Sequence, residues 1–310
     1  MKLNKKVAIL LVLYNEEKYI ERLAKSIINQ TYKEISIYAI DNNSADSSLS
    51  LLLKYFPYAN TISSKKNLGF AEGNNILAKN AINNKEDLLF ILNTDMELDS
   101  DCITNLVEVI YENDDVVGAG PIVYFGNKDG RTHNVQCYAD KTNFTNASTR
   151  TLYTGSDINF EELPQTLYVN ALHGGCFMIQ SSLISEIGLF NKDNFMYNDE
   201  VDLAYRIHKH NGKLLVIKNA RAWHFHDWSK KNKTGYYLQY YYMNRNRFLF
   251  FYRHNKYFSV FREVMIGLFS FPLKIKWAKK TAGLKLLKYY YLGYWHGLLN
   301  KKGKAKIEFK

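Results

Sequence analysis

Carboxylates gather directly after a predicted buried strand. Residues 87–92 have the apolar pattern of a strand, and the loop that follows carries Asp95, Glu97 and Asp99. A polar turn would explain this loop, because Asn and Asp favour turns. A divalent metal at the carboxyl end of a parallel strand would explain it too, because open α/β sheets bind ligands there. The loop alone leaves both interpretations open, and we expect Asp95 to be exposed on it.

Two further groups could do chemistry. Asp199, Glu200 and Asp202 begin a predicted helix, where the helix dipole favours carboxylates. Large residues precede them, which indicates the rim of a cleft that holds a general base. His224 and His226 lie on one face of a predicted strand, and each is either a metal ligand or a buried, satisfied histidine.

The elements that must position these residues alternate between strand and helix. Residues 7–14, 35–40, 60–64 and 87–92 are strand-like, and segments with helical apolar spacing lie between them. This order predicts an α/β fold with a mostly parallel, doubly wound sheet. Residues 126–166 are polar and weakly patterned, and we expect a variable excursion over the surface. Further strands are expected in GGCFMIQ, KLLVI and RAWHFH.

Polar residues follow each of the four strands. The carboxyl ends of parallel strands share one edge of a sheet, so these sites predict a crevice that binds a nucleotide. Asp41 could accept a hydrogen bond from a base or ribose, or could cap a helix. Gly69 and Gly73 could let backbone approach a ligand or simply begin a helix. The candidate nucleotide-binding residues are Tyr14, Asn15, Glu16, Asp41, Asn67, Gly69, Asn93, Thr94 and Asp95.

Charge divides the chain of 310 residues into two parts. The net charge is +11, but residues 251–310 hold 14 Lys and Arg against 2 Asp and Glu, so the body is nearly neutral. A neutral body argues against a nucleic-acid-binding protein, which needs cations across its footprint. The three cysteines form no CxxC pair, which favours a reducing cytoplasm over a zinc ribbon or a disulfide framework. The apolar start lacks a cleavage site and is better explained as a buried strand than as a signal peptide.

Seven motifs in order resemble glycosyltransferase family 2, in particular the rhamnosyltransferase-like enzymes of bacterial surface polysaccharides. They are VLYNEE, IDNNSADSS, NLGFAEGNN, LNTDMELD, GGCFMI, FMYNDEVDLAYR and HFHDWS, and they cover roughly residues 5–250. The resemblance implies a GT-A fold at residues 1–250, with a nucleotide-binding half (1–100) and an acceptor-binding, catalytic half (101–250). Residues 251–310 would be a basic, helical C-terminal region.

The resemblance also implies roles. Asp95 and His224 would bind Mg²⁺ or Mn²⁺ on the diphosphate of a nucleotide sugar, with Asn93 in place of the first carboxylate of the family's DxD motif and Asp227 in place of a usual Gly. Asp41 would contact the base, and Asn15 and Glu16 would line the pocket. Glu200, in the acidic pair with Asp199, would be the general base of an inverting transfer, although Asp199 and Asp202 stay open as alternatives.

The expected function is therefore inverting, metal-dependent transfer of a hexosyl or rhamnosyl group, from a dTDP-rhamnose or UDP-hexose donor, to a saccharide or lipid-linked saccharide of the cell envelope. The alternatives are a nucleotidyltransferase and a non-catalytic binder of nucleotide sugars or sugars. Basic and aromatic residues of segment 257–310 predict a peripheral membrane surface rather than a span, because Lys, Arg, Trp and Tyr favour the interface. We thus expect a cytoplasmic protein at the inner face of the cell membrane.

Overall fold

The computed structural model describes residues 4–156, 158–226 and 233–309. Its first half builds four parallel strands, as predicted, and they lie in the order β3-β2-β1-β4. The strands are β1 (Val7–Leu13), β2 (Ile35–Asp41), β3 (Asn60–Ser63) and β4 (Leu88–Leu92). The helices between them are α1 (Glu17–Ile28), α2 (Ser48–Tyr55) and α3 (Phe70–Asn83). β1 and β4 are apolar and buried, as expected of strands covered by helices on both faces.

The second half extends the same sheet with mixed strand directions. β11 (Cys176–Gln180) runs antiparallel between β4 and β6 (Val116–Asn127), and β12 (Lys213–His224) runs parallel to β6. The segments KLLVI and RAWHFH thus form one long strand. The short strand β5 (Met96–Leu98) pairs with the end of β12, and β10 (Thr166–Val169) forms the edge. The helices of this half are α4 (Cys102–Glu112), α5 (Ser181–Ile187) and α6 (Asp199–Lys209), with single 3₁₀ turns at Phe160–Glu162 and Lys192–Asn194.

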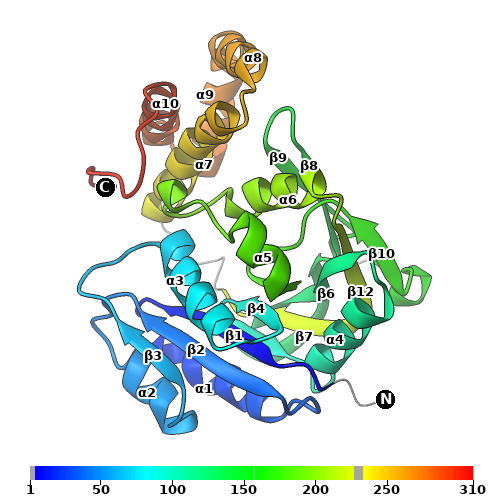
Figure 1. Ribbon diagram of the computed structural model, residues 1–310. Helices are drawn as coiled ribbons and strands as arrows, with labels where there is room; N and C mark the ends of the chain where they lie inside the picture. Colours follow the sequence, from blue (N-terminus) through cyan, green and yellow to red (C-terminus); the bar gives the residue numbers. More distant parts are fainter. Residues whose placement is uncertain (1–3, 157, 227–232, 310) are drawn as a thin grey trace.

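Two apolar cores cover the two faces of the sheet. Helices α1, α2 and α4 pack on one face and α3, α5 and α6 on the other. Figure 1 shows the resulting three layers, with α3 and α5 above the sheet. The expected α/β fold with a mostly parallel central sheet is confirmed.

The excursion at residues 126–166 is more ordered and more buried than expected. β7 (Gly130–Cys137) pairs with β6, and β8 (Ala139–Asn143) forms a hairpin with β9 (Ser148–Leu152). Tyr138, Ala139 and Asp140 are buried. The expectation of a purely superficial excursion is therefore wrong, because this segment packs against the site described below.

The C-terminal helices form an aromatic layer outside the sheet (Figure 1). They are α7 (Lys233–Arg253), α8 (Tyr257–Phe269), α9 (Phe271–Thr281) and α10 (Lys285–Leu298). Tyr289, Tyr290 and Tyr294 of α10 pack on α7 and are buried, so they form core and not membrane-facing surface. The division of the chain at residue 250 stays a prediction and falls inside α7. Within the described part of the chain, no helix is both long enough and apolar enough to cross a membrane.

Candidate active site

The loops after β1 and β2 interlock at the carboxyl edge of the sheet. Leu13 and Asp41, the last residues of these strands, are paired in register. Asn15, with φ of 59°, accepts a hydrogen bond from the Ala45 amide at 2.7 Å, and Asp41 accepts one from the Ser44 amide at 3.1 Å. Asp41 is half-buried and Tyr14 exposed. The predicted residues therefore meet at this edge, and their contacts to a nucleotide stay a prediction.

Asn42, which the sequence analysis did not single out, ties the next loop to this edge. Its buried amide donates to the Asn67 side chain and to the Gly69 carbonyl, both at 3.2 Å, and its oxygen accepts from the Leu68 amide at 2.8 Å. Gly69 has φ of +89°, and a Cβ there would overlap the carbonyl oxygen of Phe195. Close packing against the loop before α6 therefore explains this glycine without a ligand.

Asp95 lies between two histidines. Its Oδ2 stands 3.1 Å from Nε2 of His224 and 3.3 Å from Nδ1 of His226. Backbone pairing holds this arrangement, because Met96 pairs with His224 and the Phe225 amide donates to the Asp95 carbonyl at 2.8 Å. Both histidines reach the same carboxylate, as the alternation of a strand predicts, while Phe225 between them packs under the guanidinium of Arg22.

The Asp95 carboxylate is not exposed as expected: its side chain is 13% accessible, because β5 draws the loop against β12. Burial opposes its ionisation, but the hydrogen bonds and charges of His224 and His226 outweigh that effect and hold the pKa of Asp95 well below its usual range. Its other oxygen, Oδ1, is buried and has no hydrogen-bond partner among the described residues. A buried orphan oxygen beside two imidazole nitrogens fits a divalent metal.

A residue from the excursion at 126–166 orients His224. Nδ1 of His224 lies 3.1 Å from Oε1 of Gln136 on β7, which leaves Nε2 directed at Asp95. Such outer contacts fix the orientation of a metal-binding imidazole. The family resemblance implied Asp95 and His224 as ligands and included neither His226 nor Gln136. The i, i+2 spacing of the two histidines had already indicated that His226 could be a ligand, but no local signal indicated Gln136. The last three residues of the HFHDWS motif, 227–229, lie outside the described residues.

A second polar cluster continues from His224. His173 stands with its ring centroid 6.3 Å from that of His224, and its Nδ1 lies 3.8 Å from Oδ2 of Asp140. Asp140 also accepts a hydrogen bond from the Thr151 hydroxyl at 2.8 Å. These residues come from β8, β9 and the loop before β11, so no local pattern in the sequence joined them to His224.

Glu200 lies beside this second cluster. A Cβ added to Gly174 would stand 3.5 Å from its Oε2, at ordinary van der Waals distance, so the loop before β11 lies directly against this carboxylate. Burial raises the pKa of Glu200, and the nearby charge of Asp140 adds to the rise. The next glycine, Gly175, accepts from the Asn93 amide at 2.8 Å. The loop of residues 173–175 thus connects the Asp95 loop with Glu200.

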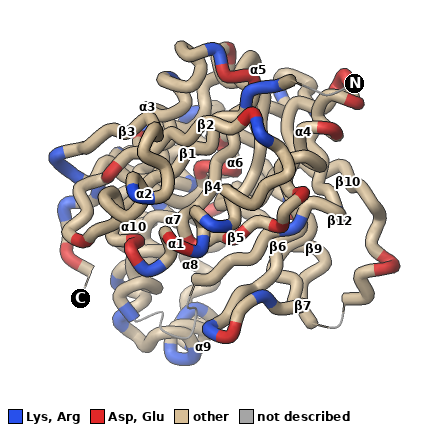
Figure 2. Tube along the Cα trace, turned by 90° about the horizontal axis from the view of Figure 1, so that it is seen from below, with Lys and Arg blue, Asp and Glu red and all other residues tan. Residues whose placement is uncertain are grey.

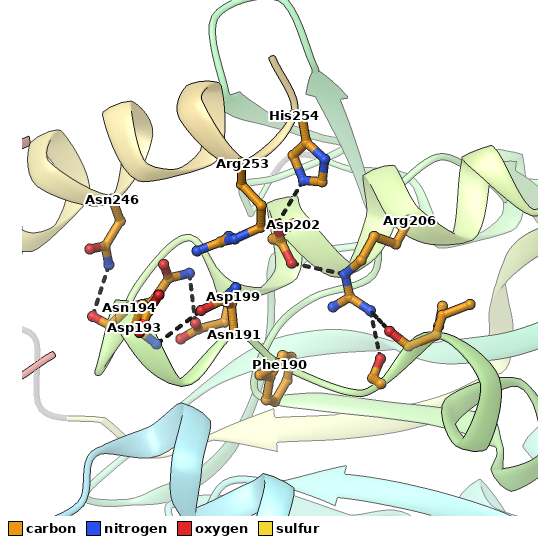
Figure 3. Close-up of polar contacts among 12 residues, drawn as sticks. Phe190, Asn191, Asp193, Asn194, Asp199, Asp202, Arg206, Asn246, Arg253 and His254 are labelled. Atoms are coloured by element: carbon orange, nitrogen blue, oxygen red, sulfur yellow. Dashed lines mark hydrogen bonds and ion pairs between the residues drawn. The ribbon is translucent and has the colours of Figure 1, made fainter. Parts of the chain in front are cut away.

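Asp199 and Asp202 have different surroundings from Glu200, and Figure 3 shows the contacts of these two aspartates. Asp199 is 2% exposed and accepts from the Asn194 amide group at 3.0 Å, and burial raises its pKa well above the usual range. Asp202 binds Arg206, Arg253 and His254. Burial opposes its ionisation, but the hydrogen bond from His254 and the charges of the two arginines hold its pKa well below the usual range. With its oxygens so engaged, Asp202 is suited to hold α6 against α7 and not to accept a substrate proton.

Comparison with known proteins gives one family. The model of "Glycosyl transferase family 2" matches residues 8–188. The low-salt glycan biosynthesis hexosyltransferase Agl10 of Haloferax volcanii is 26% identical over 245 residues, which are 78% of this chain and 74% of that protein. An uncharacterized glycosyltransferase of Haemophilus influenzae is 41% identical over 73 residues, 23% of each chain.

Solved structures share the fold at low identity. GalNAc-T7 with UDP, GalNAc and Mn²⁺ superposes with a TM-score of 0.57 at 18% identity, over 71% of this chain and 43% of that one. Residues 1–349 of S. aureus TarS superpose with a TM-score of 0.55 at 15% identity, over 96% of this chain and 81% of that one. This chain thus spans less than half of the GalNAc-T7 chain.

Proposed function

We propose that this chain, which belongs to glycosyl transferase family 2, transfers a sugar from a nucleoside-diphosphate sugar to an acceptor hydroxyl, with inversion at the anomeric carbon. The observation that carries the proposal is the cluster of Asp95, His224 and His226, from which His173 leads towards Glu200. One end of this arrangement offers metal ligands and the other a carboxylate of raised pKa. Both groups are what an in-line sugar transfer requires.

The donor is proposed to lie over the carboxyl ends of β1, β2 and β4. Asp41 would accept a hydrogen bond from the nucleoside, and Asn15 and Glu16 would line the same pocket, together with Tyr14, Asn67, Asn93 and Thr94. UDP-hexose and dTDP-rhamnose are the two candidate classes. The hexosyltransferase relative and the UDP-bound structural neighbour support the UDP-hexose class, whereas a rhamnosyl donor has only the sequence resemblance behind it.

The metal is proposed to be Mn²⁺ rather than Mg²⁺. Asp95 would supply its orphan oxygen, and His224 and His226 would supply ring nitrogens. Mg²⁺ prefers oxygen ligands only, whereas imidazole suits transition metals, so a set with two nitrogens favours Mn²⁺. When bound, the ion would neutralise the charge that develops on the departing diphosphate. The GalNAc-T7 structure, solved with UDP, GalNAc and Mn²⁺, supports a divalent ion in such a fold.

Glu200 is proposed to be the general base. Its carboxylate would accept the proton of the acceptor hydroxyl while that oxygen forms a bond to the anomeric carbon. The bond from this carbon to the diphosphate oxygen breaks on the opposite face, and the electron pair leaves with the nucleoside diphosphate. Burial raises the pKa of Glu200 and makes it a stronger base than an exposed glutamate.

The acceptor is proposed to be a saccharide or a lipid-linked saccharide of surface polysaccharide or cell-envelope glycan synthesis. A lipid-linked acceptor would place the enzyme, as a peripheral protein, at the inner face of the cell membrane. The basic composition of residues 251–310 supports this setting, because anionic head groups attract Lys and Arg.

The test is a panel of UDP-, dTDP- and GDP-sugars with the full-length protein and Mn²⁺. We expect one donor to raise the melting temperature, because a ligand that binds only the folded state stabilises it. The same donor should release its nucleoside diphosphate when a saccharide acceptor is added. Pyrophosphate release from a nucleoside triphosphate and a sugar phosphate would instead identify a nucleotidyltransferase. Binding of a donor without turnover on any acceptor would support a non-catalytic binder.

A further inference from the structure

Helix α8 turns its small and polar residues inward and its large apolar residues outward. Ser259, Glu263 and Gly267 recur every four residues and form the buried face. On the opposite face, Phe258 is 75% and Phe269 78% exposed. A helix that packs on a protein and faces water shows the reverse pattern. The outer face of α8 is therefore suited to surroundings less polar than water.

The contacts of the buried face hold this orientation. The Glu263 carboxylate, 5% exposed, binds Arg247 of α7 at 2.5 Å, and its backbone carbonyl accepts from the Tyr294 hydroxyl. A Cβ at Gly267 would stand only 3.0 Å from the Tyr294 ring, so a larger residue at this position would push α8 away. Rotation of α8 to bury its phenylalanines would break the ion pair and bring bulky side chains against Tyr294.

The apolar surface continues onto α9 across the turn at Ser270. Leu273 is 72% exposed, and Phe271 also reaches the surface. We call this surface the α8–α9 apolar face, and it comprises Tyr257, Phe258, Phe261, Ile266, Leu268, Phe269, Phe271 and Leu273. Exposed apolar residues so concentrated in one short segment mark an interaction site and not ordinary surface variation.

Cations accompany this face. Lys276, Lys279 and Lys280 of α9 are exposed, whereas Glu263, the one acidic residue between positions 257 and 281, is buried against Arg247. Figure 2 shows blue segments around α9 with few red ones beside them. The surface is thus apolar with an uncompensated positive charge.

We propose that the α8–α9 apolar face docks the protein onto an anionic lipid bilayer, with its phenylalanines and leucines among the acyl chains and the α9 lysines at the head groups. Large apolar residues beside lysines are the features of helices that lie in a membrane interface. The described helices are too short or too polar to span a bilayer, so they would lie in its surface. The inference deepens the peripheral location in the proposed function, yet it requires no donor, acceptor or turnover.

The first experiment removes the apolar side chains. The full chain should sediment with vesicles of phosphatidylglycerol and phosphatidylcholine. The triple variant Phe258→Ser, Leu268→Ser, Phe269→Ser should bind at least about tenfold more weakly, because it loses the groups that enter the acyl region. Tyr58→Ser is the control, since Tyr58 is 97% exposed but lies on the loop between α2 and β3. Unchanged melting temperatures would show that all variants fold.

The second experiment removes the charge. Lys276→Gln, Lys279→Gln, Lys280→Gln should weaken binding and reduce its dependence on salt, because salt screens the attraction to head groups. Lys54→Gln, Lys79→Gln, Lys85→Gln removes three exposed lysines from the body and should bind as the parent does.

Four results would overturn the proposal. One is triple-serine binding equal to that of the parent, and another is equal binding of the parent to neutral and anionic vesicles. The third is absence of vesicle binding together with a mass that rises with protein concentration, which would assign the face to a second copy of the chain. Loss of binding only on neutralising Lys301, Lys304 and Lys306 would move the docking site to the C-terminal segment. Because sedimentation needs no sugar, none of these results depends on the glycosyltransfer proposal.

Discussion

Nη1 of Arg253, the last residue of α7, lies 2.7 Å from Oδ1 of Asp202 on α6. His254 reaches the same oxygen at 2.8 Å, and Arg206 reaches the other at 2.9 Å (Figure 3). One buried carboxylate thus binds the C-terminal helices to the helix that carries Glu200. The network explains how the C-terminal helices are held against α6.

Asp202→Asn should destabilise the protein by roughly 3–5 kcal/mol, because it leaves two partly buried arginines, Arg206 and Arg253, without their counter-charge. Urea unfolding at pH 7 measures the loss. Asp193→Asn is the control: Asp193 forms a more exposed pair with Lys302, and such pairs contribute only about 0–1 kcal/mol. A loss below about 1 kcal/mol in Asp202→Asn would contradict the structural role of the network.

The same network predicts the direction of acid sensitivity. The pKa of Asp202 is held well below its usual value of about 3.9, so the contribution of Asp202 is fully present above about pH 4. It is lost as the pH falls through the lower pKa of the folded state. The difference in urea midpoint between the parent and Asp202→Asn should therefore shrink on acidification below pH 4. A constant difference down to pH 2 would contradict this assignment.

Asp95→Asn should raise the Mn²⁺ concentration that turnover requires. The amide keeps the shape of the side chain but removes the charge between His224 and His226, so the affinity for Mn²⁺ should fall by at least about tenfold. Turnover as a function of Mn²⁺ concentration measures this. Asp99→Asn, a carboxylate of the neighbouring turn that pairs with Arg131, should keep the Mn²⁺ dependence of the parent. Parent-like Mn²⁺ dependence in Asp95→Asn would rule out Asp95 as a ligand.

Glu200→Gln should lower kcat by about 10²–10⁴-fold with little change in donor affinity, because a general base acts in the transition state. The base must be ionised and burial raises its pKa, so the activity of the parent should fall on acidification at a higher pH than an ordinary glutamate would give. A pH profile of kcat measures the midpoint. Asp199→Asn retains the contact with Asn194 and is the comparison. A larger fall in Asp199→Asn than in Glu200→Gln would transfer the role to Asp199.

Asn246→Ala should lower kcat by misplacing the loop before Glu200. The Asn246 side chain donates to the carbonyls of Asn194, Met196 and Tyr197. These contacts hold a loop in which Phe195, Tyr197 and Asn198 all have positive φ. The Asn194 carbonyl keeps its bond from Arg245, but the carbonyls of Met196 and Tyr197 lose this donor. A buried carbonyl left unpaired costs roughly 1–3 kcal/mol, so stability should fall as well. Asn244→Ala is the control, because the hydrogen bond that the Asn244 side chain makes among the described residues stays within its own helix, to the Tyr240 carbonyl. An unchanged kcat in a destabilised Asn246→Ala would restrict Asn246 to a stabilising role.

Local patterns predicted much of the fold and part of the candidate site. The alternation of apolar strands and helices predicted β1 to β4 and their parallel order, because burial on both faces requires continuous apolar runs. The polar residues after those strands do meet at one edge, as at Leu13 and Asp41. The i, i+2 spacing of His224 and His226 also predicted that both side chains point to one side.

Other features followed from contacts between distant segments. The segment whose polarity predicted a surface excursion contains Gln136 and Asp140, and His173 follows it in the chain. Only the packing of β7 and β8 brings these three residues to His224 and Glu200. The burial of Asp95 depends on the pairing of β5 with β12.

The sequence by itself determined the element order, the family-like motifs and the basic character of the C-terminal region, because each depends on residues close together in the chain. Tertiary structure decided which carboxylate of Asp199, Glu200 and Asp202 remains available to accept a proton. Arg253 and His254, some fifty positions away in the chain, bind Asp202, whereas Glu200 stays beside His173. It also decided which aromatic residues of the basic region are core and which are surface. Tyr290 and Phe269 are both aromatic residues of this region. Tyr290 is buried and Phe269 is exposed, and this difference depends on how the helices pack.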